Sequence, residues 1–155
     1  MSEGSSRTGS SAGRKLKVLL VGKAAPDRGG IPTFLEMLTR GELSRLVDVD
    51  LLNVAHTGTP EGGKFTTGNI KRTLADARAV RRLAKGRDVV HIHSALAPTV
   101  TIIRAGLLAA AARSAGAAVV VHAHGGELRA WLRSDRRRRF LRLAMKPVAK
   151  VVAVW

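Results

Sequence analysis

Five short apolar runs alternate along the chain with longer segments of helical periodicity, and this alternation constrains the fold more than any other feature. Runs of this length, bounded by glycine or polar residues, are typical of strands in a parallel sheet. Strands that alternate with helices favour βαβ units. The sequence therefore predicts an α/β fold, a Rossmann-like, doubly wound parallel sheet. The strands are expected at Lys15–Gly22, Val47–Val54, Asp88–His93, Ala117–His124 and Val151–Val154.

The segments between these runs carry the signals of helices. The first helix begins near Pro32 or at a capping box, Thr33–Glu36, and would direct Phe34, Leu35 and Leu38 at the sheet. A second helix is expected to be capped by Asn69. The remaining helices are expected at about Pro98–Ser114, apolar nearly all round and so covered by neighbours, at Glu127–Leu132, and at Asp135 to about Val148. Acidic residues alternate through Val47–Val54 and place that strand near the sheet edge.

At 155 residues the chain is long enough for one domain with a core. Residues 1–14 are rich in Ser and Gly and lack an apolar segment, so they predict a disordered tail followed by a domain over 15–155. Cysteine is absent, which fits a cytoplasmic protein, and charged residues interrupt the apolar stretch that precedes Val121. A final strand without a closing helix indicates that the chain is one half of something larger.

Two histidine pairs follow the third and fourth predicted strands. His93 and His124 fall at the strand ends, beside Ser94 and Gly125–Gly126, where ligands bind in open α/β sheets. Their partners two residues earlier, His91 and His122, lie within the strands and are expected to be core histidines with satisfied hydrogen bonds.

The same His-x-His pairs raise the question of a metal. With no cysteine and only Asp88 and Glu127 as adjacent carboxylates, the sequence predicts neither a metal site nor a cofactor. No nucleophile elbow or Ser-His-Asp order is present either.

Gly29 and Gly30 precede the first predicted helix, a geometry that binds anions through backbone N–H groups and the helix N-terminus. The segment is neither a dinucleotide fingerprint nor a P-loop, because both consensus patterns are missing. An ordinary turn between strand and helix explains it equally well.

The chain has a formal net charge of +16, and the positive charge is concentrated between Glu127 and Lys150. An amphipathic basic helix in this region suits an anionic membrane surface, whereas the alternative is a solvated cationic face. Nucleic acid is a less favoured partner, since only Trp131 and Phe140 offer stacking surfaces. The candidate membrane or polyanion residues are Arg133, Arg136, Arg137, Arg138, Arg139 and Arg142.

In order and spacing, these segments resemble the N-terminal domain of the family-4 retaining glycosyltransferases of the GT-B fold. The resemblance covers about 15–155. It is carried by the segments Lys17–Val21, Gly29–Ile31, Asp88–Ser94, Val119–Gly126 and Val151–Val154.

The resemblance implies a role for each strand-end residue. Gly29 and Gly30 would approach the diphosphate of a nucleotide-sugar donor, and His124 would be the catalytic histidine that faces the transferred hexose. His93, Ser94 and Gly125–Gly126 would line the acceptor side, for a sugar or lipid-linked acceptor. Transfer in this family is thought to proceed with retention and without a metal.

The resemblance also implies what the chain lacks. The family's donor-binding domain, with its paired glutamates, does not occur in it, so we expect the isolated chain to have no transferase activity. The alternative is a stand-alone Rossmann-like module that binds a polyanion or an anionic membrane. In either case we expect a cytoplasmic protein, with peripheral attachment to the inner face of the membrane as an option.

Overall fold

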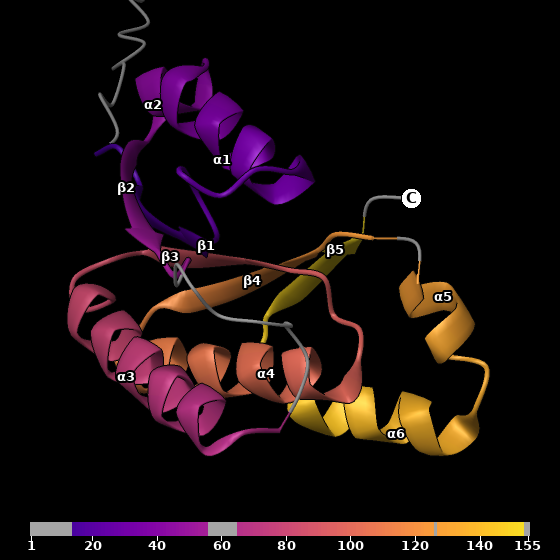
Figure 1. Cartoon of the computed structure of the whole chain (residues 1–155). Coiled ribbons are helices and arrows are strands. Elements are labelled where there is room, and N and C mark those ends of the chain that lie inside the picture. Colours follow the sequence, from indigo (N-terminus) through magenta and orange to yellow (C-terminus); the bar gives the residue numbers. More distant parts are fainter. Residues whose placement is uncertain (1–13, 56–64, 126, 154–155) are drawn as a thin grey trace, which may run out of the picture.

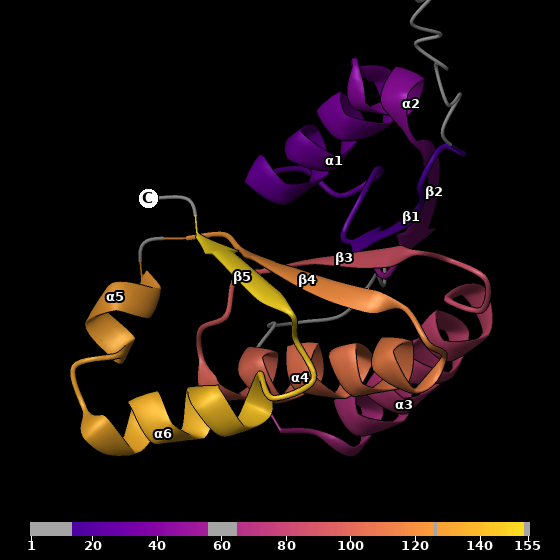
Figure 2. The same ribbon diagram turned by 180° about the vertical axis from the view of Figure 1, so that it is seen from behind.

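A computed structural model describes residues 14–55, 65–125 and 127–153 of the chain. It contains a five-stranded, fully parallel sheet with the order β2-β1-β3-β4-β5. Helices cover both faces of this sheet (Figures 1 and 2), so the predicted α/β, doubly wound fold is confirmed. The predicted tail up to Gly13, residues 56–64, Gly126 and the last two residues lie outside the described residues.

Each of the five apolar runs forms a strand, and the boundaries differ from the predicted ones by a residue or two. The strands are β1 (Lys17–Gly22), β2 (Asp48–Asn53), β3 (Val89–Ser94), β4 (Ala118–Ala123) and β5 (Lys150–Ala153). The helices are α1 (Gly30–Arg40), α2 (Leu43–Leu46), α3 (Thr67–Leu83), α4 (Thr99–Ser114), α5 (Glu127–Trp131) and α6 (Asp135–Ala144). None of the described helices is long and apolar enough to cross a bilayer.

The two faces of the sheet are covered to different extents. On one face, α3, α4 and α6 lie over a continuous apolar core that includes Leu19, Ile92 and Val121. On the opposite face, α1 packs through Leu35 on a much smaller cluster that includes Leu20. Figure 2 shows α1 and α2 above the side of the sheet that holds β1 and β2, with β4 and β5 extending beyond these helices.

The strand β2 lies at the edge of the sheet, as its alternating acids predict. Asp50 of this strand forms an ion pair with Arg87, which stands just before β3. Because β2 is at an edge, its carboxylates can stay hydrated while they meet this partner.

Helix α4 has the most buried residues of the described helices. This confirms the prediction that this helix, which is apolar nearly all round, is covered by its neighbours. It lies against β3, β4, α3 and α6. A Cβ atom placed on Gly106 would stand 2.6 Å from the carbonyl oxygen of Ala144, so glycine permits α4 and α6 to approach at this point.

Three helix boundaries differ from the predicted ones. Helix α1 begins at Gly30 with Gly29 as its N-cap, so Thr33–Glu36 is not a capping box at its start. Thr66, not Asn69, caps α3, because the extended Thr66 backbone lets its hydroxyl accept a hydrogen bond from the Asn69 N–H at 3.1 Å. The last long helix ends at Ala144 instead of Val148, since Pro147 disfavours helical backbone at the residue before it.

Candidate functional site

The order of the strands reverses between β1 and β3, which places a topological switch point at the centre of the sheet. In open α/β sheets the crevice outside the carboxyl ends of such strands is the usual ligand site. The loop that leads from Gly22 to α1 and the loop that follows Ser94 both begin at this edge.

The glycine turn forms the first side of the site. Gly29 has a φ of +129°, which favours glycine, and serves as the N-cap of α1, while Gly30 is the first residue of the helix. Both are exposed, and no side chain caps the helix N-terminus. The N-terminal backbone of α1 is therefore presented openly, as a helix terminus that binds an anion must be.

Asn53 and Gly22 fix where this loop begins. The Asn53 side chain at the end of β2 accepts a hydrogen bond from the Ala24 N–H at 3.0 Å and donates one to the Ala25 carbonyl at 2.8 Å. A Cβ atom on Gly22 would lie 2.8 Å from the Leu35 side chain and 3.1 Å from the Cβ atom of His93. The absence of a side chain at Gly22 thus lets both α1 and β3 pack closely against the end of β1.

His93 and His124 meet at the ends of the two central strands. Nδ1 of His93 and Nε2 of His124 are 3.0 Å apart and share one hydrogen bond. The backbone N–H of His124 also donates to the Ser94 carbonyl at 2.8 Å. Parallel register therefore brings together two histidines that are 31 residues apart in the sequence.

Phe34 of α1 covers this histidine group. Its ring centroid lies 5.6 Å from that of His93, 5.0 Å from that of His122 and 5.3 Å from that of His124. Phe34 stands about one turn beyond Gly30, so the glycine turn and the histidines border the same edge of the sheet. The pattern of the sequence directs Phe34 at the sheet, but it gives no sign that the ring lies on histidines.

His91 and His122 differ from the prediction of satisfied core histidines. Nε2 of His91 and both ring nitrogens of His122 are buried and have no hydrogen-bond partner among the described residues. The rings nearest to them are Phe34 and other histidines, and among the described residues none is placed to form a hydrogen bond with these nitrogens.

Burial makes all four imidazoles poor bases. It lowers the pKa of His91 from 6.5 to about 4 and that of His93 to about 2, and nearby histidines lower both further by repulsion between the charged forms. The pKa values of His122 and His124 are also lowered, mainly by burial. At neutral pH the group therefore consists of uncharged rings that can accept a hydrogen bond or bind a Lewis acid.

The other predicted site residues fall into two places. Ser94 is half-buried at the end of β3, where its hydroxyl accepts a long hydrogen bond from the Leu96 N–H at 3.4 Å, and Gly125 is exposed with a φ of +106°. Gly126 lies outside the described residues. The candidate arginines lie on and just before α6, away from the histidines and on the other face of the sheet (Figure 1).

Comparisons with known structures give only distant likenesses. A pilus assembly-related protein from Burkholderia pseudomallei is 13% identical, with a TM-score of 0.42 over 89% of this chain and 78% of that chain. The homoserine dehydrogenase of S. aureus is 10% identical, with a TM-score of 0.41 over 90% of this chain and 32% of that chain. Neither likeness bears on function, and no curated protein matches the sequence.

A family comparison is far more informative. The sequence model named Glycosyltransferase Family 4 matches residues 28–154, which include the glycine turn, both histidine pairs and β5. That match spans most of the chain and agrees with the parallel α/β fold. The chain therefore belongs to glycosyltransferase family 4 and is an N-terminal domain of that family.

Proposed function

We propose that this chain is the acceptor-side half of a retaining glycosyltransferase that moves a hexose from a nucleotide sugar to a sugar or lipid-linked acceptor. The observation that carries the proposal is the 3.0 Å contact between His93 and His124 at the switch point, beside the open N-terminus of α1. The helix N-terminus offers a place for an anion, and the adjacent histidines offer a place for a polar, uncharged ligand.

Each group has a role that its environment suits. The backbone N–H groups at Gly29 and Gly30 would face the donor diphosphate. His124, uncharged because its pKa is lowered, would orient a sugar hydroxyl by a hydrogen bond and would not protonate it. His93 would hold His124 in position, while Ser94, Gly125 and Gly126 would line the acceptor side.

The donor-binding half of the enzyme would come from a second α/β domain. We therefore expect the 155-residue chain alone to bind donor weakly and to transfer no hexose, since most of the donor contacts would be missing. Robust transfer from a nucleotide sugar by the purified chain would contradict this expectation.

The site itself is testable in the isolated chain by NMR. On titration with a nucleoside diphosphate hexose in the presence of a chelator, the amide signals of Gly29 and Gly30 and the imidazole signals of His124 should shift together. A His124→Ala substitution should weaken binding about tenfold, the cost of roughly one hydrogen bond to a ligand.

The matched control removes a polar side chain away from the site. Arg72→Ala on α3 should leave the affinity unchanged, because α3 covers the other face of the sheet. Inorganic pyrophosphate and an uncharged hexoside should each reproduce part of these shifts, and failure of both to do so would count against the proposed site. Shifts confined to the arginines of α6 would count against it as well.

A second candidate function is attachment to an anionic membrane surface. Arg133, Arg136, Arg139 and Arg142 are exposed on or next to α6, and Arg137 stacks on Trp131 with its guanidinium carbon 5.4 Å from the ring centroid. Leu143 is 72% exposed on the same helix. Basic and apolar side chains together are what an interfacial helix needs.

Vesicle flotation tests this attachment. Changing Arg136–Arg139 to Ser should abolish binding to vesicles that contain phosphatidylserine, because each basic residue near the surface contributes about 1 kcal/mol. The control changes four exposed cations on α3 or just after it to Ser, and it lowers the net charge by the same amount as the α6 variant. These residues are Arg78, Arg81, Arg82 and Lys85. Equal loss in both variants would show a nonspecific charge effect and refute a docking face on α6.

A further inference from the structure

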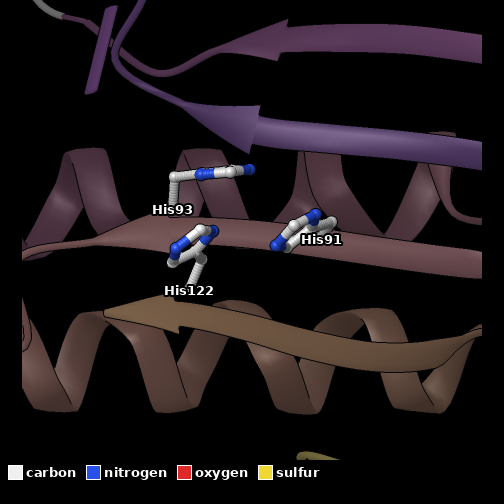
Figure 3. A group of neighbouring side chains, drawn as sticks. All are labelled: His91, His93 and His122. Atoms are coloured by element: carbon white, nitrogen blue, oxygen red, sulfur yellow. The ribbon is translucent and has the colours of Figure 1, made fainter. Parts of the chain in front are cut away.

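Three histidines gather on the face of the sheet beneath α1. His91 and His93 project from β3 and His122 from β4, and Figure 3 shows the three rings side by side. One ring nitrogen from each of them lies within 4.8 Å of the others. The rings of His91 and His122 are parallel to within 2°, with centroids 5.5 Å apart.

The ring nitrogens of this cluster are buried without partners. His93 and His122 are only 5% and 6% exposed, yet Nε2 of His93, Nε2 of His91 and both nitrogens of His122 make no hydrogen bond within the described part of the chain. Leaving a buried polar atom unpaired costs about 1–3 kcal/mol, and most such atoms in folded proteins have a partner. Several together therefore point to a ligand that satisfies them.

The remaining nitrogen of His93 is already engaged. When Nδ1 of His93 donates to Nε2 of His124, the lone pair of His93 Nε2 is left free and its ring orientation is fixed. Histidines that bind metals characteristically have their second nitrogen held by such an outer partner. Burial also keeps the rings uncharged near neutral pH, and the uncharged imidazole is the form that binds a metal.

We propose that His91, His93 and His122 bind one divalent transition-metal ion of the zinc type, with His124 as the outer partner of His93. Nε2 of His91, Nε2 of His93 and one nitrogen of His122 would be the ligands, and a water molecule would complete a tetrahedral set. Ligand nitrogens in such a site are about 3.4 Å apart, as bond lengths of about 2.05 Å require, so small ring rotations would close the set.

Other ligand classes suit the cluster less well. Among the described residues, no Lys or Arg is among the groups that perturb the pKa values of these three histidines, so an anion would meet no cation there. Hard cations such as magnesium prefer oxygen ligands, whereas imidazole favours zinc, copper, nickel and cobalt. The site goes beyond the proposed transferase role, in which no metal takes part.

The experiment uses the whole chain without a polyhistidine tag, treated with a chelator and then dialysed. Titration with Co²⁺ near pH 7.5 should produce the visible absorption bands of a tetrahedral ion, and Zn²⁺ should displace them at one equivalent per chain. His122→Asn or His91→Asn should weaken binding at least 100-fold. His124→Ala should weaken it about tenfold, as expected for the loss of an outer partner.

His56→Asn is the matched control, because it removes the one other histidine of the chain and should leave the affinity unchanged. Imidazole NMR signals locate the ion in the unmodified chain, so the result does not depend on whether a variant folds. Zinc should shift the signals of His91, His93 and His122. The proposal would be overturned if the metal affinity were unchanged in His122→Asn or if no stoichiometric binding occurred. NMR shifts confined to the His56 imidazole would overturn it too.

The two proposals remain separable. Nucleotide-sugar binding is measured with chelator present, and metal binding is measured without sugar. Loss of one signal therefore says nothing about the other.

Discussion

Between pH 6.5 and 5 the metal-free chain should lose at least about 2 kcal/mol of its free energy of unfolding, because histidines that are uncharged in the fold become charged when it unfolds. His93, whose pKa falls from 6.5 to about 2, accounts for a slope of about 1.4 kcal/mol per pH unit. His91 adds to the slope down to a pH of about 4.

The direction follows from proton binding in the two states. Well above pH 6.5 these histidines are uncharged both folded and unfolded, so stability does not depend on their titration. Below pH 6.5 the unfolded chain takes up protons that the fold excludes, and stability falls with pH until the folded pKa is reached. Among the described residues, the only titratable groups that perturb the pKa values of His91 and His93 are other histidines of the cluster, so no described carboxylate offsets the loss.

Urea unfolding with chelator present at several pH values measures the slope. His93→Asn should reduce it by about 1.4 kcal/mol per pH unit, whereas His56→Asn should leave the contribution of the cluster intact. A free energy of unfolding that is constant from pH 7 to 5 would contradict the burial of uncharged rings. The window ends at pH 5 because carboxylates such as Asp88, whose pKa is lowered by Arg14, titrate further down.

Gly106→Val should cost about 3 kcal/mol, the upper end of the usual range for overpacking. A Cβ atom at this position would approach the Ala144 carbonyl oxygen to 2.6 Å and its carbonyl carbon to 3.4 Å. These are backbone atoms, so no side-chain rotation can relieve the contact and α6 must move away from α4. Gly106→Ala should also destabilise, although a gain in helix propensity of about 1 kcal/mol offsets part of its cost.

Gly68 provides the matched control within the same chain. It lies in the first turn of α3, and among the described residues a Cβ atom there would meet only the Thr66 hydroxyl oxygen at 3.9 Å. Gly68→Ala should therefore be neutral or stabilising, by at most about 1 kcal/mol. Chemical denaturation of both alanine variants measures the difference, and equal effects would show that α4 and α6 do not meet at Gly106.

Much of the fold follows from the sequence because each strand has its own local signal. Short apolar runs between segments of helical periodicity predicted all five strands, and the acids Asp48 and Asp50 placed β2 near the edge. The ends of the helices were harder to predict. Asn69 is as good a capping residue as Thr66, and only the extended backbone at Thr66 decides between them. The early end of α6 depends on a proline whose effect on the preceding residue competes with the apolar pattern.

The site could be predicted only in part. Histidines at the ends of neighbouring strands were expected to share an edge, and His93 and His124 do lie together. The cover by Phe34 and the anchoring by Asn53 could not be predicted, because both depend on how loops and α1 settle over the sheet. The missing partners of His122 depend on neighbours from another strand and a helix, which a single stretch of sequence does not specify.

The unequal cover of the sheet gives its two sides unequal resistance to local opening. Within the described part of the chain, helix α1 rests on a cluster of only four buried residues, Val18, Leu20, Ala24 and Leu35, while α4 is embedded in the large core. Segments with few buried apolar contacts separate from the fold at a lower free energy than the global transition. The glycine turn is thus attached to the part of the fold that is expected to open first, so the side proposed to receive ligands is also the side with the lower free energy of local opening.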